Sequence, residues 1–127
     1  KHENLKEKVV ILENVSNPYP YFKIADLFVL SSLYEGFPNV LTEAIMFGVP
    51  VITSNCNSGP SEILLKKSGP QFFNKGNHKQ LTFRIKSFFK NRRIISKRKT
   101  YLIKMLRRFQ KNKIIKEYDE FFNNLFN

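Results

Sequence analysis

Residues 26–44 read DLFVLSSLYEGFPNVLTEA, and this stretch decides the fold class. Residues 27–30 are a short apolar run rich in strand-forming side chains, which is typical of a strand buried on both faces. A polar turn follows over residues 31–38. Residues 40–47 then predict a helix, with a proline near its first turn and a glycine just after its end. Strand, turn and helix in that order form the repeating unit of a parallel α/β sheet.

The same alternation continues on both sides of this stretch. Residues 9–12 read VVIL and residues 51–53 read VIT, and both predict further buried strands. Residues 71–73 predict a short edge strand. Two short helices are expected, around residues 19–25 and from residue 60 to about residue 65, because each begins at or near a proline. We therefore expect residues 1–77 to form a Rossmann-like parallel sheet flanked by helices, incomplete at its N-terminus.

The chain changes character at about residue 78 and becomes helical. Three apolar stripes at helical spacing follow, and the segment contains no proline. The stripes are Leu81, Ile85, Phe88 and Phe89, then Ile94, Tyr101, Leu102, Met105 and Phe109, then Ile114, Ile115, Tyr118, Phe121, Phe122 and Leu125. Residues 78–127 are thus expected to be a tail of amphipathic, basic helices that pack on the core.

Composition excludes several classes of protein and site. The 127 residues are 42% hydrophobic and 25% charged, as in an ordinary globular domain. No run approaches the roughly 20 apolar residues that a membrane span needs, and the polar opening residues predict no signal peptide. Cys56 is the single cysteine, so neither a disulfide within the chain nor a thiolate zinc site is expected, and a reducing cytoplasm is the default location.

Cys56 and the two histidines are not expected to carry chemistry. Cys56 is expected to pack as a small side chain rather than act as a nucleophile, because no histidine lies near it in sequence. His2 and His78 lack the spacing of metal ligands. The sequence therefore predicts no metal site.

The net charge of +12 is concentrated in one segment. Residues 84–116 contain fourteen Lys and Arg and no acid, whereas residues 1–83 contain eight basic and seven acidic residues. One interpretation is a solvated helix face. A second is attraction of Arg84–Lys116 to an anionic membrane surface. A third is nucleic-acid binding, which no zinc-finger or similar motif supports.

Two loops follow predicted parallel strands and lead into helices, residues 31–39 and residues 55–60. Ligands of open parallel sheets bind at that edge, and free amides at helix N-termini favour phosphate. Glu35 and Glu43 are separated by seven residues, a spacing that suits a clamp on sugar hydroxyls and also suits two solvated acids. Gly36 and Gly59 would let a ligand approach the backbone.

The full string of residues 26–44 strongly resembles the E-x7-E signature of family 4 glycosyltransferases, the large group 1 set with a GT-B fold. Residues 48–52 (GVPVI) and 58–64 (SGPSEIL) match the two blocks that follow it in that family, and residues 17–20 (NPYP) match an upstream block. The resemblance is close over residues 9–64 and looser beyond. It implies the C-terminal, donor-binding domain of the GT-B fold.

The resemblance also implies a role for each residue of the signature. Glu35 would be the catalytic glutamate that faces the donor sugar, and Glu43 would bind the ribose hydroxyls of the nucleotide. The remaining donor-binding residues would lie between these two glutamates. The turn would face the donor sugar and the diphosphate, and it comprises Gly36, Phe37, Pro38 and Asn39. The start of the helix, Val40 and Leu41, would be aimed at the diphosphate.

By resemblance, the reaction would be transfer of a hexosyl-type sugar from a nucleoside-diphosphate donor with retention of configuration. By the same resemblance the nucleotide would be UDP, and neither a metal nor another cofactor would be needed. The acceptor would be a glycan or a lipid-linked sugar in surface polysaccharide or glycolipid synthesis. The enzyme would lie in the cytoplasm, peripheral on the inner face of the membrane.

The family also has parts that this sequence lacks. Its acceptor-binding N-terminal domain would be a missing partner, and its Arg and Lys pair that grips the diphosphate has no match in residues 1–8. The last helix, about residues 114–126, would cross toward that domain and be partly exposed without it. We therefore expect this chain alone not to turn over. The alternatives are a non-catalytic basic module that binds membrane or nucleic acid, and an inactive truncated remnant.

Overall fold

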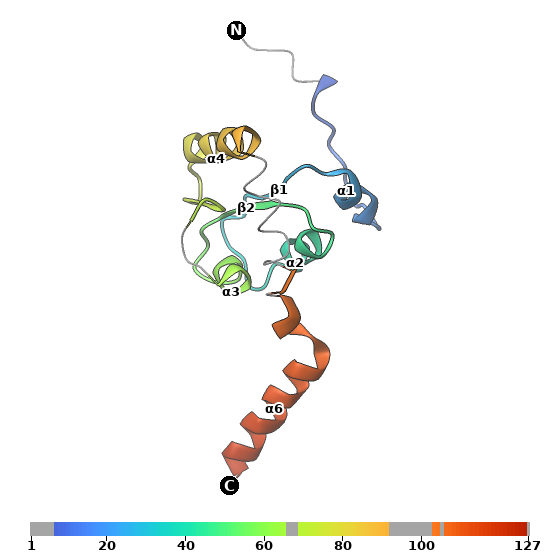
Figure 1. Cartoon of the computed structure of the whole chain (residues 1–127), viewed down its shortest axis with the longest axis vertical. Coiled ribbons are helices and arrows are strands. Elements are labelled where there is room, and N and C mark those ends of the chain that lie inside the picture. Colours follow the sequence, from blue (N-terminus) through green and yellow to red (C-terminus); the bar gives the residue numbers. More distant parts are fainter. Residues whose placement is uncertain (1–6, 66–68, 92–102, 105, 127) are drawn as a thin grey trace.

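A computed structural model of the chain describes residues 7–65, 69–91, 103–104 and 106–126. Three parallel strands form one sheet in the order β1-β2-β3, namely β1 (Phe28–Leu30), β2 (Val51–Ser54) and β3 (Phe72–Phe73). The helices are α1 (Tyr19–Ile24), α2 (Asn39–Met46), α3 (Pro60–Leu64), α4 (His78–Lys90), the 3₁₀ helix η2 (Arg107–Phe109) and α6 (Lys111–Phe126). The fold is the Rossmann-like α/β sheet with a helical C-terminal tail that the sequence predicts (Figure 1).

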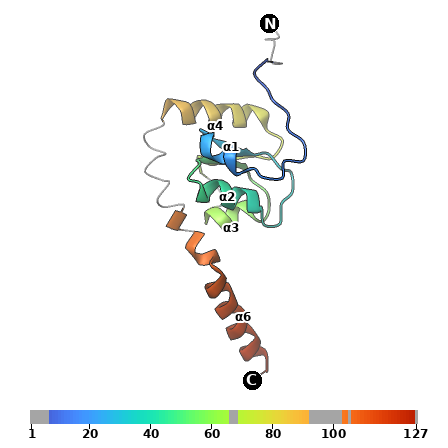
Figure 2. The ribbon, with the colours of Figure 1, turned by 90° about the vertical axis from the view of Figure 1, so that its right-hand side faces the viewer.

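Helices cover both faces of the sheet, with α4 on one face and α2 and α3 on the other (Figures 1 and 2). The strands pair in register, Phe28 beside Val51 and Thr53 beside Phe72. Because side chains alternate between the faces of a strand, each strand contributes to two separate cores. This explains why β1, β3 and the first two residues of β2 form continuous apolar runs rather than alternating.

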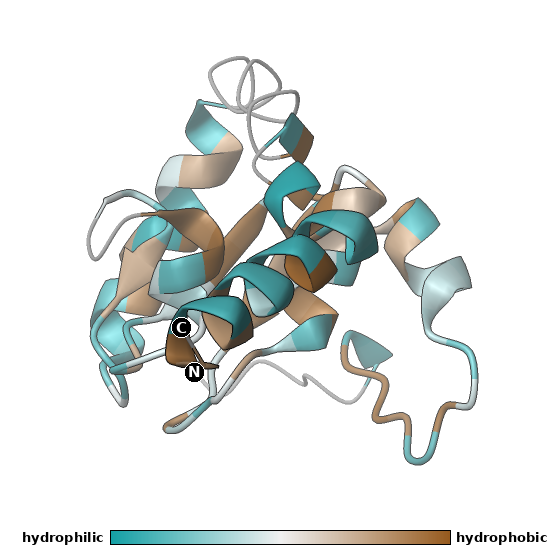
Figure 3. Cartoon of the chain, turned by 90° about the horizontal axis from the view of Figure 1, so that it is seen from below, coloured by the Kyte–Doolittle hydropathy of each residue, from teal (hydrophilic) through white to brown (hydrophobic). Residues whose placement is uncertain are grey.

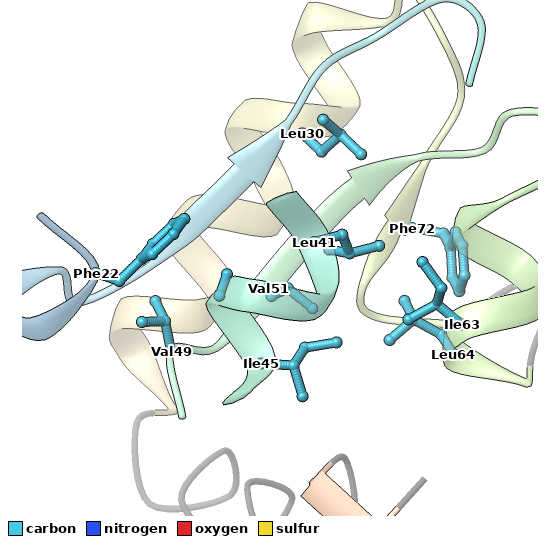
Figure 4. Packing of buried hydrophobic residues seen from close by; sticks show 10 residues of the cluster. Phe22, Leu30, Leu41, Ile45, Val49, Val51, Ile63, Leu64 and Phe72 are labelled. Atoms are coloured by element: carbon cyan, nitrogen blue, oxygen red, sulfur yellow. The ribbon is translucent and has the colours of Figure 1, made fainter. Parts of the chain in front are cut away.

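The larger core lies under α2 and α3 (Figure 4). Leu41, Ala44 and Ile45 of α2 are at most 1% exposed, and they pack on the strand face that carries Val51. α1 adds Phe22, whose ring lies 5.8 Å from that of Phe28. The cluster comprises Phe22, Leu30, Leu41, Ala44, Ile45, Val49, Val51, Ile63, Leu64 and Phe72. This core fixes the position at which α2 begins.

The smaller core lies under α4. Ile52 and Phe73 point to this face and meet Phe88 of α4, with Leu81 and Ile85 packed around them. Three residues of the first apolar stripe in the tail therefore face the sheet, as expected. Asn77 caps the helix, since its Oδ1 accepts a hydrogen bond from the Gln80 amide at 2.9 Å.

The expectation of a buried strand at residues 9–12 is wrong. These residues have no regular secondary structure, and Val10 and Ile11 are 80% and 82% exposed. An apolar run becomes a buried strand only where a neighbouring strand pairs with it, and β1 pairs with β2 alone among the described strands. The run therefore remains solvent-exposed.

The tail departs from the expected packing on the core at α6. Most of the second apolar stripe lies outside the described residues, and Leu106 and Phe109 near its end pack against the larger core. α6 buries none of its residues and projects from the body of the molecule (Figure 2). Figure 3, seen from below, shows both hydrophobic and hydrophilic residues along α6. The sequence expectation that its stripe is partly exposed is confirmed.

A search of the described residues for a helix both long enough and apolar enough to cross a lipid bilayer finds none.

Candidate functional site

Three loops meet at the carboxyl edge of the sheet, because all three strands are parallel. Residues 31–38 connect β1 to α2, residues 55–59 connect β2 to α3, and residues 74–77 connect β3 to α4. The first of these, called here the glutamate loop, carries Glu35. The second is called here the bracing loop, because its contacts fix the first.

The bracing loop and the end of β2 hold the glutamate loop by its backbone. The Ser32 carbonyl accepts hydrogen bonds from Ser54 Oγ at 2.5 Å and from Cys56 Sγ at 3.2 Å. The Glu35 carbonyl accepts one from Ser58 Oγ at 2.8 Å. Cys56 is buried, as expected for a packing side chain. The main chain at Glu35 is thus fixed through its carbonyl, which leaves the carboxylate out of this network.

Gly59 lets the two loops touch backbone to backbone. It has a φ of +73°, and a Cβ placed on it would lie 2.3 Å from the Gly36 carbonyl oxygen and 2.7 Å from Pro38 Cδ. The sequence interpretation of this glycine, access for a ligand, is therefore corrected, because its lack of a side chain serves loop–loop packing. At Gly36 the space beside the backbone is open, so there the absence of a side chain does leave room for a ligand.

Helix α2 begins directly after the glutamate loop with its first amides uncapped. Pro38 occupies the N-cap position and makes no side-chain cap. Helix geometry leaves the amides of Asn39 and Val40 without an acceptor inside the helix, and the helix dipole adds partial positive charge there. This end of α2 can accept an anion such as a phosphate.

Leu41 and Pro38 do not fit the contacts expected of donor-binding residues. The Leu41 side chain is 0% exposed, and its amide donates to the Pro38 carbonyl at 3.0 Å. Leu41 therefore anchors α2 in the core and has no group left for a ligand. Pro38 is buried and has no amide hydrogen, so it contributes shape alone.

Glu35 and Glu43 both belong to this edge, one in the glutamate loop and one in α2. Both side chains are half-buried. In the part of the chain that the structure describes, neither carboxylate has a hydrogen bond or an ion pair. A half-buried carboxylate without a protein partner is available to accept hydrogen bonds from sugar hydroxyls.

Sequence reasoning missed three residues at this edge, Ser58, Lys75 and Phe109. Lys75, in the loop after β3, places its Nζ 4.9 Å from the centre of the Tyr34 ring. It supplies a positive charge, whereas residues 31–39 and 55–59 contain neither Lys nor Arg. The signal for Lys75 was present, since it follows the strand predicted at residues 71–73. The contact of Phe109 with Phe37, at 5.0 Å between ring centres, has no local sequence signal.

No group of three or more His, Cys, Asp or Glu side chains within the described residues could hold a metal ion. The glutamate loop, α2 and Lys75 instead offer two carboxylates, backbone amides and an ammonium group. Such a set can bind a phosphate group and sugar hydroxyls.

Comparison with known sequences gives one family. The sequence model described as "Glycosyl transferases group 1" matches residues 1–116. The chain is 44% identical over 61 residues to an uncharacterized glycosyltransferase of Methanocaldococcus jannaschii, a match that covers 48% of this chain and 15% of that protein. It is 28% identical over 135 residues to the O-antigen biosynthesis glycosyltransferase WclY of Escherichia coli, covering 99% of this chain and 34% of WclY.

A third relative acts on a lipid-linked sugar according to its name. It is the N-acetylgalactosamine-N,N'-diacetylbacillosaminyl-diphospho-undecaprenol 4-alpha-N-acetylgalactosaminyltransferase of Campylobacter jejuni, 38% identical over 63 residues, which covers 50% of this chain and 17% of that protein. The chain thus spans between 15% and 34% of the length of these three relatives.

Proposed function

The chain belongs to the group 1 glycosyl transferases, and from that membership we propose that its carboxyl edge binds the activated sugar donor of a transfer reaction. The donor is a nucleoside-diphosphate sugar, with UDP as the favoured nucleotide. The observation that carries the proposal is the glutamate loop, which is held by its backbone at the uncapped start of α2, while the carboxylates of Glu35 and Glu43 have no partner among the described residues.

Each group at the edge has a task that suits its chemistry. The amides of Gly36, Asn39 and Val40 face the diphosphate, where they stabilise the charge that builds up as the sugar leaves. Glu35 accepts hydrogen bonds from the donor sugar near the reacting carbon, and Glu43 accepts them from the ribose. In this proposal the amides and the helix dipole replace a divalent metal, so binding is metal-independent.

The wider reaction is proposed from the family and the names of the relatives. The sugar is a hexosyl group transferred with retention of configuration, in a GT-B arrangement whose other domain binds the acceptor. The acceptor is a glycan or a lipid-linked sugar of a surface polysaccharide, which agrees with the names of the relatives from Escherichia coli and Campylobacter jejuni. We propose that the reaction takes place in the cytoplasm, at the inner face of the membrane.

Calorimetric titration of the chain with UDP tests the donor site. Glu43→Gln and Glu35→Gln keep the shape of the side chain and remove its charge. A hydrogen bond to a charged group contributes about 1.5–3 kcal/mol. Glu43→Gln is therefore expected to weaken UDP binding about 10- to 100-fold. Because the Glu35 side chain is proposed to face the sugar, Glu35→Gln is expected to weaken binding of a UDP-sugar more than binding of UDP.

The matched controls are Glu13→Gln in an exposed loop and Glu117→Gln on α6, and both are expected to leave affinity unchanged. Addition of EDTA should also leave it unchanged. Equal effects of Glu43→Gln and Glu117→Gln on UDP affinity would contradict the proposed donor site. A loss of UDP affinity on addition of EDTA would contradict the proposal that binding needs no metal.

A further inference from the structure

The 3₁₀ helix η2 contacts the glutamate loop and α3, the helix that follows the bracing loop, from a distant part of the sequence. It consists of Arg107, Arg108 and Phe109 and lies within the basic stretch of residues 84–116. Phe109 packs against the larger core, and so does Leu106, the residue immediately before η2. η2 is therefore part of the folded body, in contrast to α6, which begins after a single intervening residue.

Arg108 binds the C-terminal end of α3. Its Nη2 donates hydrogen bonds to the carbonyls of Glu62 and Ile63, the latter at 3.0 Å. The last carbonyls of a helix have no partner within the helix, and a cation there is favoured by the helix dipole. Because α3 begins immediately after Gly59, Arg108 holds the element that carries the bracing loop.

Phe109 contacts the glutamate loop itself. Its ring packs edge-to-face on the Phe37 ring, with centres 5.0 Å apart and an angle of 76° between planes. The guanidinium of Arg108 lies 4.5 Å from the centre of the Phe109 ring, so the two side chains support each other. Phe37 directly follows Gly36. Asn39 and Val40, two and three residues after Phe37, supply the first amides of α2.

We propose that Arg108 and Phe109 are positioning residues for donor binding. They fix Phe37 on one side and α3 on the other, and thereby hold the glutamate loop in the form that meets the diphosphate. Neither residue is assigned a contact with the donor. The inference rests on the proposed function of this edge. It adds to the site a segment that follows the three described strands in the sequence.

The test compares Phe109→Ala, Phe109→Leu and Arg108→Gln in the full chain. An edge-to-face aromatic pair and a buried hydrogen bond are each modest in free energy, so losing either is expected to weaken UDP binding about 3- to 10-fold. Phe109→Leu keeps apolar bulk and should lie between the wild type and Phe109→Ala. The control is Phe83→Ala on α4, where the ring is 62% exposed, and it should leave affinity unchanged.

Hydrogen exchange at the amides of Gly36, Phe37 and Asn39 provides a readout that needs no ligand. In Phe109→Ala these amides are expected to exchange faster while those of β2 do not, which separates loop release from general unfolding. Equal acceleration in loop and sheet would overturn the inference, because it would show that Phe109 only supports the core. Unchanged loop exchange in both Phe109 variants would also overturn it.

The two readouts separate failure of the inference from failure of the proposed function. If the wild type binds no UDP yet Phe109→Ala frees the loop, the donor assignment fails and the positioning contact stands. If Glu43→Gln weakens UDP binding while the Phe109 and Arg108 variants do not, the donor site stands and the inference fails. Should Phe109→Ala not fold, Phe109→Leu gives the same comparison.

Discussion

Gly59 and Gly76 have similar φ angles but different surroundings, so substitutions at the two positions separate backbone strain from steric collision. Both have positive φ, +73° and +76°, but a Cβ on Gly76 would meet nothing within 4 Å, whereas one on Gly59 would collide with the Gly36 carbonyl. Gly76→Ala is expected to cost about 1–3 kcal/mol of stability through backbone strain. Gly59→Ala should cost about 1–3 kcal/mol more through the collision.

Denaturant unfolding measures both variants, and UDP titration shows the consequence for the site. Only Gly59→Ala moves the glutamate loop, so only it is expected to lower affinity. Equal losses of stability in the two variants would mean that the loops separate without cost, and the bracing loop would then not set the geometry around Glu35.

The carboxylates show how far residue-level prediction reached. The spacing of Glu35 and Glu43 placed one in a loop and the other in the following helix, and the structure has that arrangement. Leu41 was assigned to the ligand because it belongs to the same motif, yet its side chain is fully buried. A motif identifies a segment, whereas burial decides which of its side chains can reach a ligand.

The elements between residues 19 and 65 could be predicted from the sequence because each one carries its own signal. Short apolar runs gave β1 and β2, and a proline near the N-terminal end of α1, α2 and α3 marked where each begins. The run at residues 9–12 is apolar throughout, like β1, but pairs with no strand among the described residues. Pairing is a property of the assembled sheet, so composition alone could not distinguish the two.

Ile11 and Ile45 make this difference measurable. Ile11 is 82% exposed and Ile45 is 1% exposed. Ile45→Ala is expected to lower the free energy of unfolding by about 2–5 kcal/mol, since it leaves a cavity under α2. Ile11→Ala is expected to change it by less than about 0.5 kcal/mol, as measured by urea unfolding. A large loss for Ile11→Ala would mean that this run is buried in solution.

The whole molecule carries +12 charges, and their placement bears on the proposed membrane association. The cations of residues 84–116 that the structure describes are mostly exposed, among them Lys86, Lys90, Lys111, Lys113 and Lys116. We propose that this segment attracts anionic lipid. From residue 117 onward α6 carries the acids Glu117, Asp119 and Glu120 and no Lys or Arg, so the proposed attraction belongs to the residues before Glu117.

Sedimentation with vesicles tests this at the scale of the whole chain. Each Lys near an anionic surface contributes about 1 kcal/mol. Replacing Lys111, Lys113 and Lys116 with Ala is expected to weaken binding to phosphatidylserine vesicles by up to about 100-fold. Replacing Lys8, Lys23 and Lys79 changes the net charge equally and should have a smaller effect. Equal effects would show that total charge alone drives binding.

The contact between Phe37 and Phe109 also has a consequence for the order in which the protein becomes functional during its synthesis. All three strands and α4 are complete by Lys90, so the sheet can form while the ribosome is still adding the basic stretch. The glutamate loop leaves the ribosome early, but Arg108 and Phe109 follow much later. The sheet and α4 can therefore form before Arg108 and Phe109 are available to hold the glutamate loop, so the proposed donor site would be completed later than the fold around it.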